Sequence, residues 1–115
     1  MTARTEAMER AYQEAKARGD LQPLHEVEAI KEWFYWKLVL NRFPHDKLNT
    51  KHLMIVLKRE ADLWNITNYE ISELWREILP WLDDQYDYVK LNMKAMRSVA
   101  NVPHLHVCTY KEEYR

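Results

Sequence analysis

The chain has 115 residues, 47% of them hydrophobic, which is enough for one globular domain with a packed core and excludes a disordered chain. Its formal net charge of −1 gives no sign of the clustered Lys and Arg that a nucleic-acid-binding surface requires. The single cysteine, Cys108, excludes an intramolecular disulfide and any zinc site built on paired cysteines.

We expect one domain over residues 1–115 and a reducing, cytoplasmic location, where an unpaired cysteine is usual. No apolar run approaches the length that crosses a bilayer, and the stretch "MTARTEAMER" lacks the apolar centre of a signal peptide. We therefore expect no membrane partner. Gly19 is the only glycine, which argues against a glycine-rich phosphate loop.

The first predicted element is a helix within residues 1–20, which form an N-terminal extension. The stretch "TEAMERAYQEAKARGD" is rich in good helix formers, and Gly19 suits the end of a helix. Because few of these side chains are strongly apolar, we expect this helix to lie on the surface.

Two strands are predicted next, in residues 32–41 and 51–59, separated by a turn that contains Pro44. Aromatic and β-branched residues dominate "EWFYWKLVLN", and "KHLMIVLKR" is almost wholly apolar, so both favour a strand. We expect the two to pair antiparallel. Alternation along the first strand would direct four side chains to the core, namely Phe34, Trp36, Leu38 and Leu40.

A helix is predicted from "ITNYEISELWREIL", where Thr67 and Glu70 have the spacing of a capping box. Apolar residues repeat at helical spacing beyond Pro80, which predicts a kinked helix that continues to about Leu91. A strand within "YDYVKLNM" is the alternative. The final stretch "HLHVCTY" alternates and predicts a strand, so the fold class is α+β.

In that last strand His104, His106 and Cys108 share one face, while Leu105 and Val107 point to the core. Three interpretations follow. The polar face could simply be solvated, or its side chains could supply three zinc ligands. Alternatively, a neutral imidazole could attack phosphorus, provided that one ring nitrogen is free and a hydrogen bond holds the other. These residues alone leave the three open.

Two longer stretches carry a family resemblance. "VLNRFPHDKLNTKHLMIVLKREADLWNIT" contains an Asn-Arg-x-Pro turn followed by a histidine that opens an apolar strand, and "VPHLHVCTY" is similar to a His-φ-His-φ-His-φ-φ signature, where φ is apolar. Both resemble the histidine-triad (HIT) family of nucleotide hydrolases and transferases. The resemblance covers about residues 33–110.

The resemblance implies a HIT-like antiparallel sheet packed against the long kinked helix. It also implies cleavage of a phosphoanhydride or phosphoramidate bond through a nucleotidyl-histidine intermediate, in a nucleotide or dinucleotide substrate. By the same resemblance His106 is the nucleophile, His104 orients it, His52 supports the triad, and Asn41 binds a ribose hydroxyl.

The resemblance places Asn101 at a phosphate-binding position, although a simple turn residue is the alternative that we favour there. Ser98 and Arg97 could also donate to phosphate, Arg through its bidentate fork. Cys108 replaces the third histidine and offers only a weak donor. No metal and no cofactor are expected. His25 and His45 receive no role and are expected at the surface.

Many members of the family are homodimers, and the aromatic residues 33–36 could form such an interface, although they are equally able to be core. A second function class stays open, namely a HIT-fold nucleotide-binding or interaction module that has lost catalysis. Cys108 and the absence of glycine from "NMKAMRSVANVPH" favour that module. Retention of His104, His106, His52 and Asn41 favours an enzyme.

Overall fold

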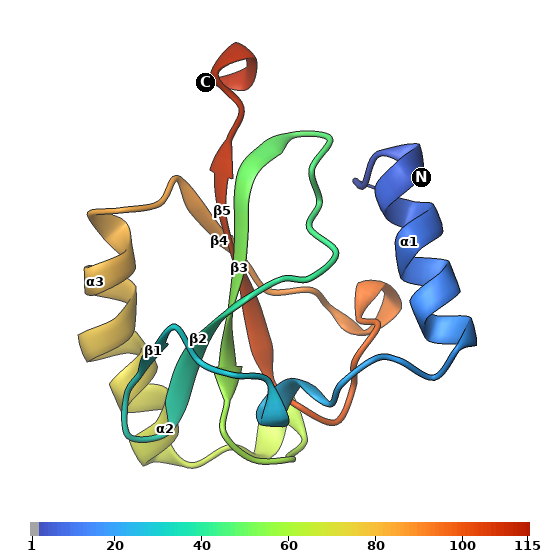
Figure 1. Cartoon of the computed structure of the whole chain (residues 1–115). Helices are drawn as coiled ribbons and strands as arrows, with labels where there is room; N and C mark the ends of the chain where they lie inside the picture. The colour runs from blue at the N-terminus through green and yellow to red at the C-terminus, as the bar shows by residue number, and fades with distance from the viewer. Residues whose placement is uncertain (1–2) are drawn as a thin grey trace.

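The structure, a computed structural model, describes residues 3–115 and has a mixed α+β fold built on a five-stranded antiparallel sheet. The strand order is β1-β2-β3-β5-β4, so the last strand of the sequence lies inside the sheet beside β3 (Figure 1). The strands are β1 (Lys31–Glu32), β2 (Trp36–Leu40), β3 (Asn49–Leu57), β4 (Tyr88–Lys90) and β5 (His104–Tyr110).

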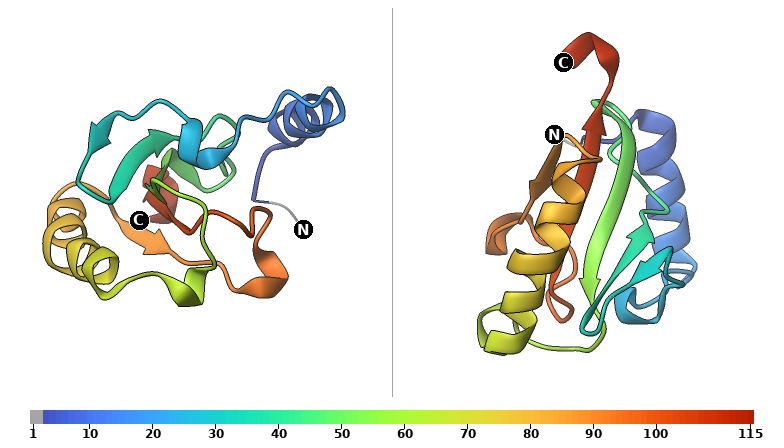
Figure 2. Two further views of the ribbon diagram at one scale, coloured as in Figure 1. Left: turned by 90° about the horizontal axis from the view of Figure 1, so that it is seen from below. Right: turned by 90° about the vertical axis from the view of Figure 1, so that its left-hand side faces the viewer.

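Helices lie on both sides of this sheet (Figure 2). The α-helices are α1 (Glu6–Ala17), α2 (Asn68–Glu73) and α3 (Leu79–Asp83), and a π-helical segment, η3 (Leu74–Ile78), joins the last two. Short 3₁₀ turns are η1 (Leu24–Glu26), η2 (Leu63–Asn65), η4 (Lys94–Met96) and η5 (Glu112–Tyr114). Within the described residues, none of the helices has both the length and the apolar character needed to cross a membrane.

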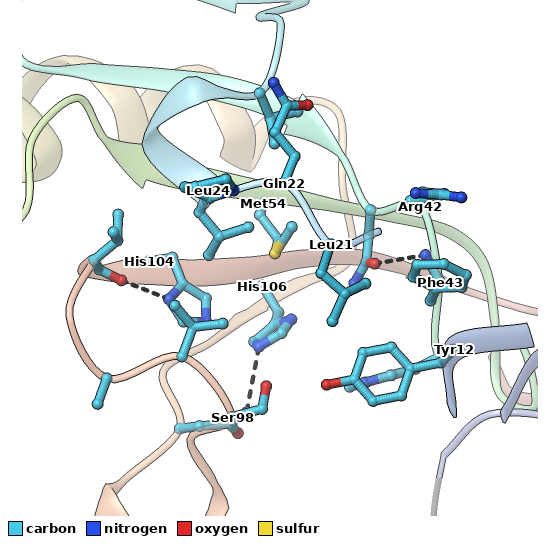
Figure 3. A pocket seen from close by; sticks show the side chains of 18 of the residues that line it. Tyr12, Leu21, Gln22, Leu24, Arg42, Phe43, Met54, Ser98, His104 and His106 are labelled. Atoms are coloured by element: carbon cyan, nitrogen blue, oxygen red, sulfur yellow. Dashed lines mark hydrogen bonds between the residues drawn. The ribbon is translucent and has the colours of Figure 1, made fainter. Parts of the chain in front are cut away.

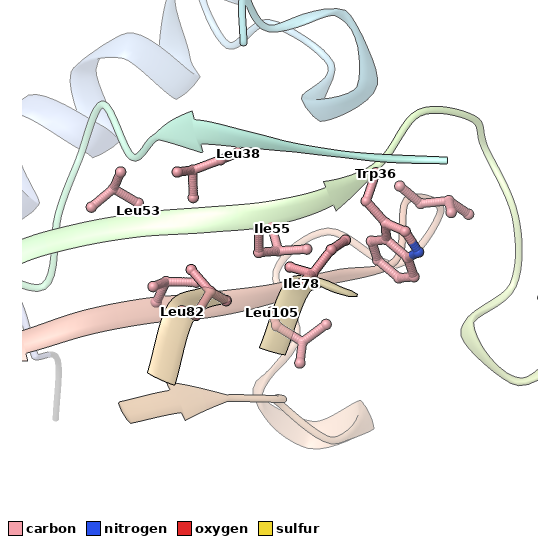
Figure 4. Close-up of a cluster of buried hydrophobic side chains, with 9 residues drawn as sticks. Trp36, Leu38, Leu53, Ile55, Ile78, Leu82 and Leu105 are labelled. Atoms are coloured by element: carbon pink, nitrogen blue, oxygen red, sulfur yellow. The ribbon is translucent and has the colours of Figure 1, made fainter. Parts of the chain in front are cut away.

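One face of the sheet packs against the α2–η3–α3 helix and forms the main core (Figure 4). Side chains two apart on each strand point to this face, which is why Leu105 and Val107 of β5 are buried there, as predicted. The buried cluster consists of Trp36, Leu38, Leu53, Ile55, Leu57, Ile78, Leu82, Leu105 and Val107.

The predicted capping box is confirmed, because Thr67 accepts from the Glu70 N–H while the Glu70 carboxylate accepts from the Thr67 N–H. The prediction that this helix continues to about Leu91 is wrong. The helix ends at Asp83, and the alternative strand forms as β4. Pairing of β4 with β5 satisfies backbone groups that a longer helix would have bonded internally, so tertiary contacts override the helical spacing.

The predicted strand over residues 32–41 is broken in the middle. Residues 33–35 form a tight turn between β1 and β2, because the buried Glu73 carboxylate accepts hydrogen bonds from the backbone N–H groups of Phe34, Tyr35 and Trp36. Phe34 is 76% exposed and Leu40 at the strand end is 64% exposed, so their assignment to the core is wrong. Trp36 and Leu38 are buried as predicted.

The N-terminal helix forms as predicted and ends at Gly19, which has φ +69°. The Asp20 N–H bonds back to the Ala15 carbonyl and the Gly19 N–H to the Lys16 carbonyl, a pattern that favours a glycine at this position. Helix α1 lies on the side of the sheet away from α2 and α3 (Figure 2).

The connector after α1 covers part of this second face. The ammonium of Lys37, which is buried on β2, donates to the backbone carbonyls of His25 and Val27 and so holds the connector against the sheet. Leu24 and Val27 then pack on a small apolar cluster of Val39, Met54, Val56 and Val102. The rest of this face carries the histidines.

Candidate functional site

A cavity of about 830 Å³ lies on the second face of the sheet, between the β3–β5 pair, the N-terminal segment and the loop that follows β4. Figure 3 shows His104 and His106 projecting side by side from β5 into this space, with Tyr12 and Phe43 at one end. Because the connector and α1 form one wall, the N-terminal extension is part of the site.

His104 and His106 share one face of β5, as the alternation predicts, and each is only 6% exposed. Cys108 lies on the same face, but it is fully buried and does not line the cavity. Its thiol interacts with Tyr88, its partner across the β4–β5 ladder. Burial raises the pKa of the Cys108 thiol, so this side chain is a protonated packing residue. The three predicted triad positions therefore split into two cavity histidines and one core cysteine.

A chain of hydrogen bonds links three histidines at the floor of the cavity. The backbone N–H of His45 donates to Nδ1 of His52 at 2.8 Å, and Nε2 of His52 lies 2.7 Å from Nδ1 of His106. Beyond His106, the Asn92 amide lies 3.2 Å from Nε2. The His45 ring also stacks on the His106 ring with centroids 5.4 Å apart and an interplanar angle of 24°. His52 thus lies beside His106, as the resemblance implied.

Burial keeps these imidazoles neutral. The pKa of His45 is lowered to about 4 and that of His52 to about 3, with desolvation as the largest cause and the positive charge of Lys90 among the smaller ones. The pKa of His106 is lowered as well, first by desolvation and then by the neighbouring histidines. His104 follows the same pattern, with desolvation as the largest cause and the Arg97 guanidinium a smaller one. At neutral pH the site therefore presents uncharged rings.

His45, His52 and His106 form the one group of metal-ligating side chains that comes together in the described part of the chain. Their ligand atoms lie within 4.8 Å of one another. Two nitrogens bound to one tetrahedral zinc lie about 3.3 Å apart, given zinc–nitrogen bonds of about 2.0–2.1 Å. The 2.7 Å between His52 Nε2 and His106 Nδ1 is instead a hydrogen-bond distance, so these rings share a proton as arranged.

The zinc set weighed from the sequence, His104, His106 and Cys108, does not come together, because Cys108 faces Tyr88. Nδ1 of His104 lies 2.9 Å from the Val102 carbonyl oxygen, so a hydrogen bond already engages this ring nitrogen. Neither arrangement is a ready metal site.

Positive charge and amide groups line the cavity near His106. Lys90 is the direct ladder partner of His106 on β4 and lines the cavity, as does Asn92 shortly after it. Ser98 and Asn101 also line the cavity, and the Asn101 amide donates to Glu60 at 3.1 Å. Arg97 does not line it, although its charge acts on His104. Lys90 was missed from the sequence because it lay within the wrongly extended helix, and Asn92, just beyond the predicted helix, was not singled out.

Asn41 lines the cavity at the end of β2, where its carbonyl oxygen accepts from the Phe43 N–H at 2.9 Å. Its amide nitrogen lies 3.3 Å from Nε2 and 3.4 Å from Nδ1 of His52. This is the local geometry of an Asx turn, so the bond to Phe43 fixes the side chain beside the histidines. A ribose-binding role for Asn41 stays a prediction.

An aromatic wall at the other end of the cavity was not predicted. The rings of Tyr12 and Phe43 meet edge to face with centroids 5.5 Å apart, and the Arg4 guanidinium lies 4.3 Å above the Tyr12 ring. The Arg4 Nε donates to the Phe43 carbonyl, which fixes the N-terminal segment against the turn before β3. No sequence motif indicates this contact, because Tyr12 and Phe43 are brought together only by the tertiary fold.

The surface expectation for His45 is wrong, because this half-buried side chain lines the cavity and contacts both His52 and His106. His25 is also half-buried, in the connector. The position of His45 in the turn directly before a histidine-bearing strand was the one available signal.

Comparisons with protein-family models, with curated proteins and with solved structures each find no match.

Proposed function

We propose that this chain is a nucleotide-binding hydrolase or nucleotidyl transferase that cleaves a phosphoanhydride or phosphoramidate bond through a nucleotidyl-histidine intermediate. The observation that carries the proposal is the pair of neutral imidazoles, His104 and His106, held side by side at the floor of a cavity large enough for a nucleotide. A neutral imidazole is the form that attacks phosphorus, because its ring nitrogen keeps a lone pair.

The surroundings of the pair suit a phosphate. Lys90 lies across the ladder from His106, and the amides of Asn92 and Asn41 border the same floor. These groups supply positive charge and N–H donors where negative charge develops on the phosphoryl oxygens. Electrostatic stabilisation of that charge is usually the largest single contribution to the rate enhancement. Ser98 and Asn101 lie along the same wall and could bind further phosphate oxygens.

The far end of the cavity suits a base and its sugar. Tyr12 and Phe43 offer aromatic surface to a planar ring, and Leu21 adds an apolar contact. The ligand would then lie with its base toward α1 and its phosphates toward β5. The bond that breaks joins the α-phosphorus to the leaving group, and water or a second acceptor releases the nucleoside monophosphate.

The test is incubation of the full chain with a panel of dinucleoside polyphosphates and adenosine phosphoramidates, followed by chromatography for nucleoside monophosphate. The proposal expects catalytic turnover with at least one member. Nucleotide affinity without turnover would favour the second class of function, a binding module that has lost catalysis. The burial of Cys108 away from the cavity is the observation that favours that alternative. Absence of both affinity and turnover would reject both.

A further inference from the structure

The proton on His104 has a fixed position. Nδ1 of His104 lies 2.9 Å from the carbonyl oxygen of Val102, which can only accept a hydrogen bond. Nδ1 must therefore carry the hydrogen, and in the neutral ring Nε2 is left with its lone pair. Among the described residues no hydrogen bond engages this Nε2. His104 has the arrangement that a nucleophilic imidazole requires, with one nitrogen held and the other free.

The proton on His106 is on the opposite nitrogen. The backbone N–H of His45 can only donate, so Nδ1 of His52 is an acceptor and the hydrogen of neutral His52 lies on Nε2. That Nε2–H points at Nδ1 of His106, 2.7 Å away, which must in turn accept. The hydrogen of neutral His106 is therefore on Nε2. The Asn92 amide nitrogen lies 3.2 Å from this Nε2, and this tautomer requires the amide to turn over so that its oxygen accepts the hydrogen. Both nitrogens of His106 are engaged.

We infer that His104 is the nucleophile toward the α-phosphorus and that His106 is a hydrogen-bond donor whose Nε2–H passes from the Asn92 amide to a phosphate oxygen when substrate binds, an inference that rests on the proposed function. The resemblance assigns the attack to His106 and an orienting role to His104. The hydrogen bonds assign the opposite roles, because two backbone groups, the Val102 carbonyl and the His45 N–H, fix the two tautomers. Neither group can exchange the roles of donor and acceptor.

The chemical step follows from these tautomers. The Nε2 lone pair of His104 forms the bond to the α-phosphorus while the bond from phosphorus to the leaving group breaks. The ring becomes a phosphoimidazolium cation, and the Val102 carbonyl accepts a stronger hydrogen bond from its Nδ1–H. Water then attacks phosphorus, the N–P bond breaks, and its electron pair returns to Nε2. The water proton leaves with the nucleoside monophosphate and is released to solvent.

The same tautomers select the leaving group. If neutral His106 gave up its Nε2 proton, a replacement proton could reach its Nδ1 only from Nε2 of His52. His52 would then be left as an imidazolate anion. His106 therefore stabilises a leaving oxygen through a hydrogen bond but supplies no proton to it. A phosphate leaves readily as an anion, whereas an amine needs a proton. The substrate class is thus a phosphoanhydride, such as a dinucleoside polyphosphate, rather than a phosphoramidate.

Nitrogen-15 NMR of the histidine side chains tests the tautomers without any substrate. Long-range proton–nitrogen correlations at about pH 7 identify the protonated nitrogen of each ring, and single His→Gln variants assign the signals. The inference expects His104 protonated on Nδ1, and His52 and His106 protonated on Nε2. A signal from His106 that shows the hydrogen on Nδ1 would overturn it, whatever the activity.

Peptide mass spectrometry locates the nucleotidyl-histidine adduct after wild-type turnover is quenched without acid. We expect it on His104. His104→Gln should abolish both adduct and turnover, whereas His106→Gln, which keeps an N–H donor, should lower the rate by about 10²–10³ and leave the adduct on His104. His25→Gln, outside the cavity, is the matched control. Circular dichroism confirms that each variant is folded.

Each remaining outcome has a definite consequence. An adduct on His106, with turnover intact in wild type, overturns this inference and leaves the proposed function standing. Equal turnover of phosphoramidates and phosphoanhydrides overturns the assignment of the leaving group. No turnover of any member of the panel by wild type rejects the proposed function, and the inference with it.

Discussion

His52 and His106 are diagonal neighbours across the β3–β5 ladder, and their rings meet with Nε2 and Nδ1 2.7 Å apart. In the register of the sheet His52 is opposite Cys108, and Met54 is opposite His106. Diagonal neighbours on one face are within reach of ring side chains. The contact therefore depends on the strand register, and it makes the two histidines one hydrogen-bonded unit in which protonation of either ring disrupts the other.

This unit predicts that acid destabilises the protein before its carboxylates titrate. The pKa of His52 is about 3 in the folded state, against an ordinary value of 6.5, so below about pH 6.5 the unfolded chain binds more protons than the folded one. The free energy of unfolding should then fall with decreasing pH, by up to about 1.4 kcal/mol per pH unit for each such histidine. Urea titrations between about pH 7 and 5 measure this slope. His52→Gln should reduce the slope, and an unchanged slope in this variant would refute the assignment.

The aromatic wall predicts a separation of binding from chemistry. Tyr12→Ala removes a ring from the aromatic wall, where the proposed function places the base, so substrate affinity should fall about tenfold while kcat changes little. Tyr69→Ala is the matched control, because Tyr69 is 75% exposed and lies on α2, on the other side of the sheet. A large loss of kcat with unchanged KM would place the base elsewhere.

Cys108 is predicted to act through packing and not through chemistry. Cys108→Ser should keep near-wild-type turnover, because the side chain does not line the cavity. Cys108→His, which restores the histidine of the HIT pattern, should destabilise the protein by about 1–3 kcal/mol, because a larger ring enters a fully buried position. Thermal unfolding and steady-state rates check both variants. A faster and equally stable Cys108→His variant would show that the third triad position does contribute a donor.

Glu73 is predicted to be a stability residue with no part in the site. Its carboxylate accepts hydrogen bonds from the N–H groups of Phe34, Tyr35 and Trp36, so Glu73→Ala should lower the free energy of unfolding by about 1–3 kcal/mol. Glu77→Ala, an exposed neighbour on the same helix, should change it by less than about 0.5 kcal/mol. Urea unfolding separates the two. Equal effects would mean that the β1–β2 turn does not depend on this carboxylate.

Much of the fold follows from local sequence patterns. The last strand, the capping box at Thr67 and the helix end at Gly19 are encoded within a few residues, and all three form as predicted. The end of the helix beyond Pro80 was not predictable in this way. Apolar residues such as Tyr86 and Val89 continue the helical spacing, and only pairing with β5 selects the strand.

In the candidate site, too, some features were predictable from local sequence patterns and others depend on the tertiary fold. His104 and His106 share a face because side chains alternate along any strand, and this was predictable without a partner. Tyr12, His45 and Lys90 reach the cavity from distant parts of the chain, through the Arg4 contact, the turn before β3 and the β4–β5 register. The burial of Cys108 under Tyr88 depends on that same register. Contacts between residues so distant in the sequence produce no local sequence pattern from which they could be predicted.

The stereochemical course at the α-phosphorus tests the central claim most directly. A substrate made chiral at that phosphorus with sulfur and oxygen isotopes is hydrolysed, and the configuration of the nucleoside monophosphate is determined by ³¹P NMR. Attack by a histidine followed by attack by water makes two in-line displacements, so the account predicts overall retention of configuration. Inversion would mean that water attacks the substrate directly, and it would contradict a nucleotidyl-histidine intermediate on either His104 or His106.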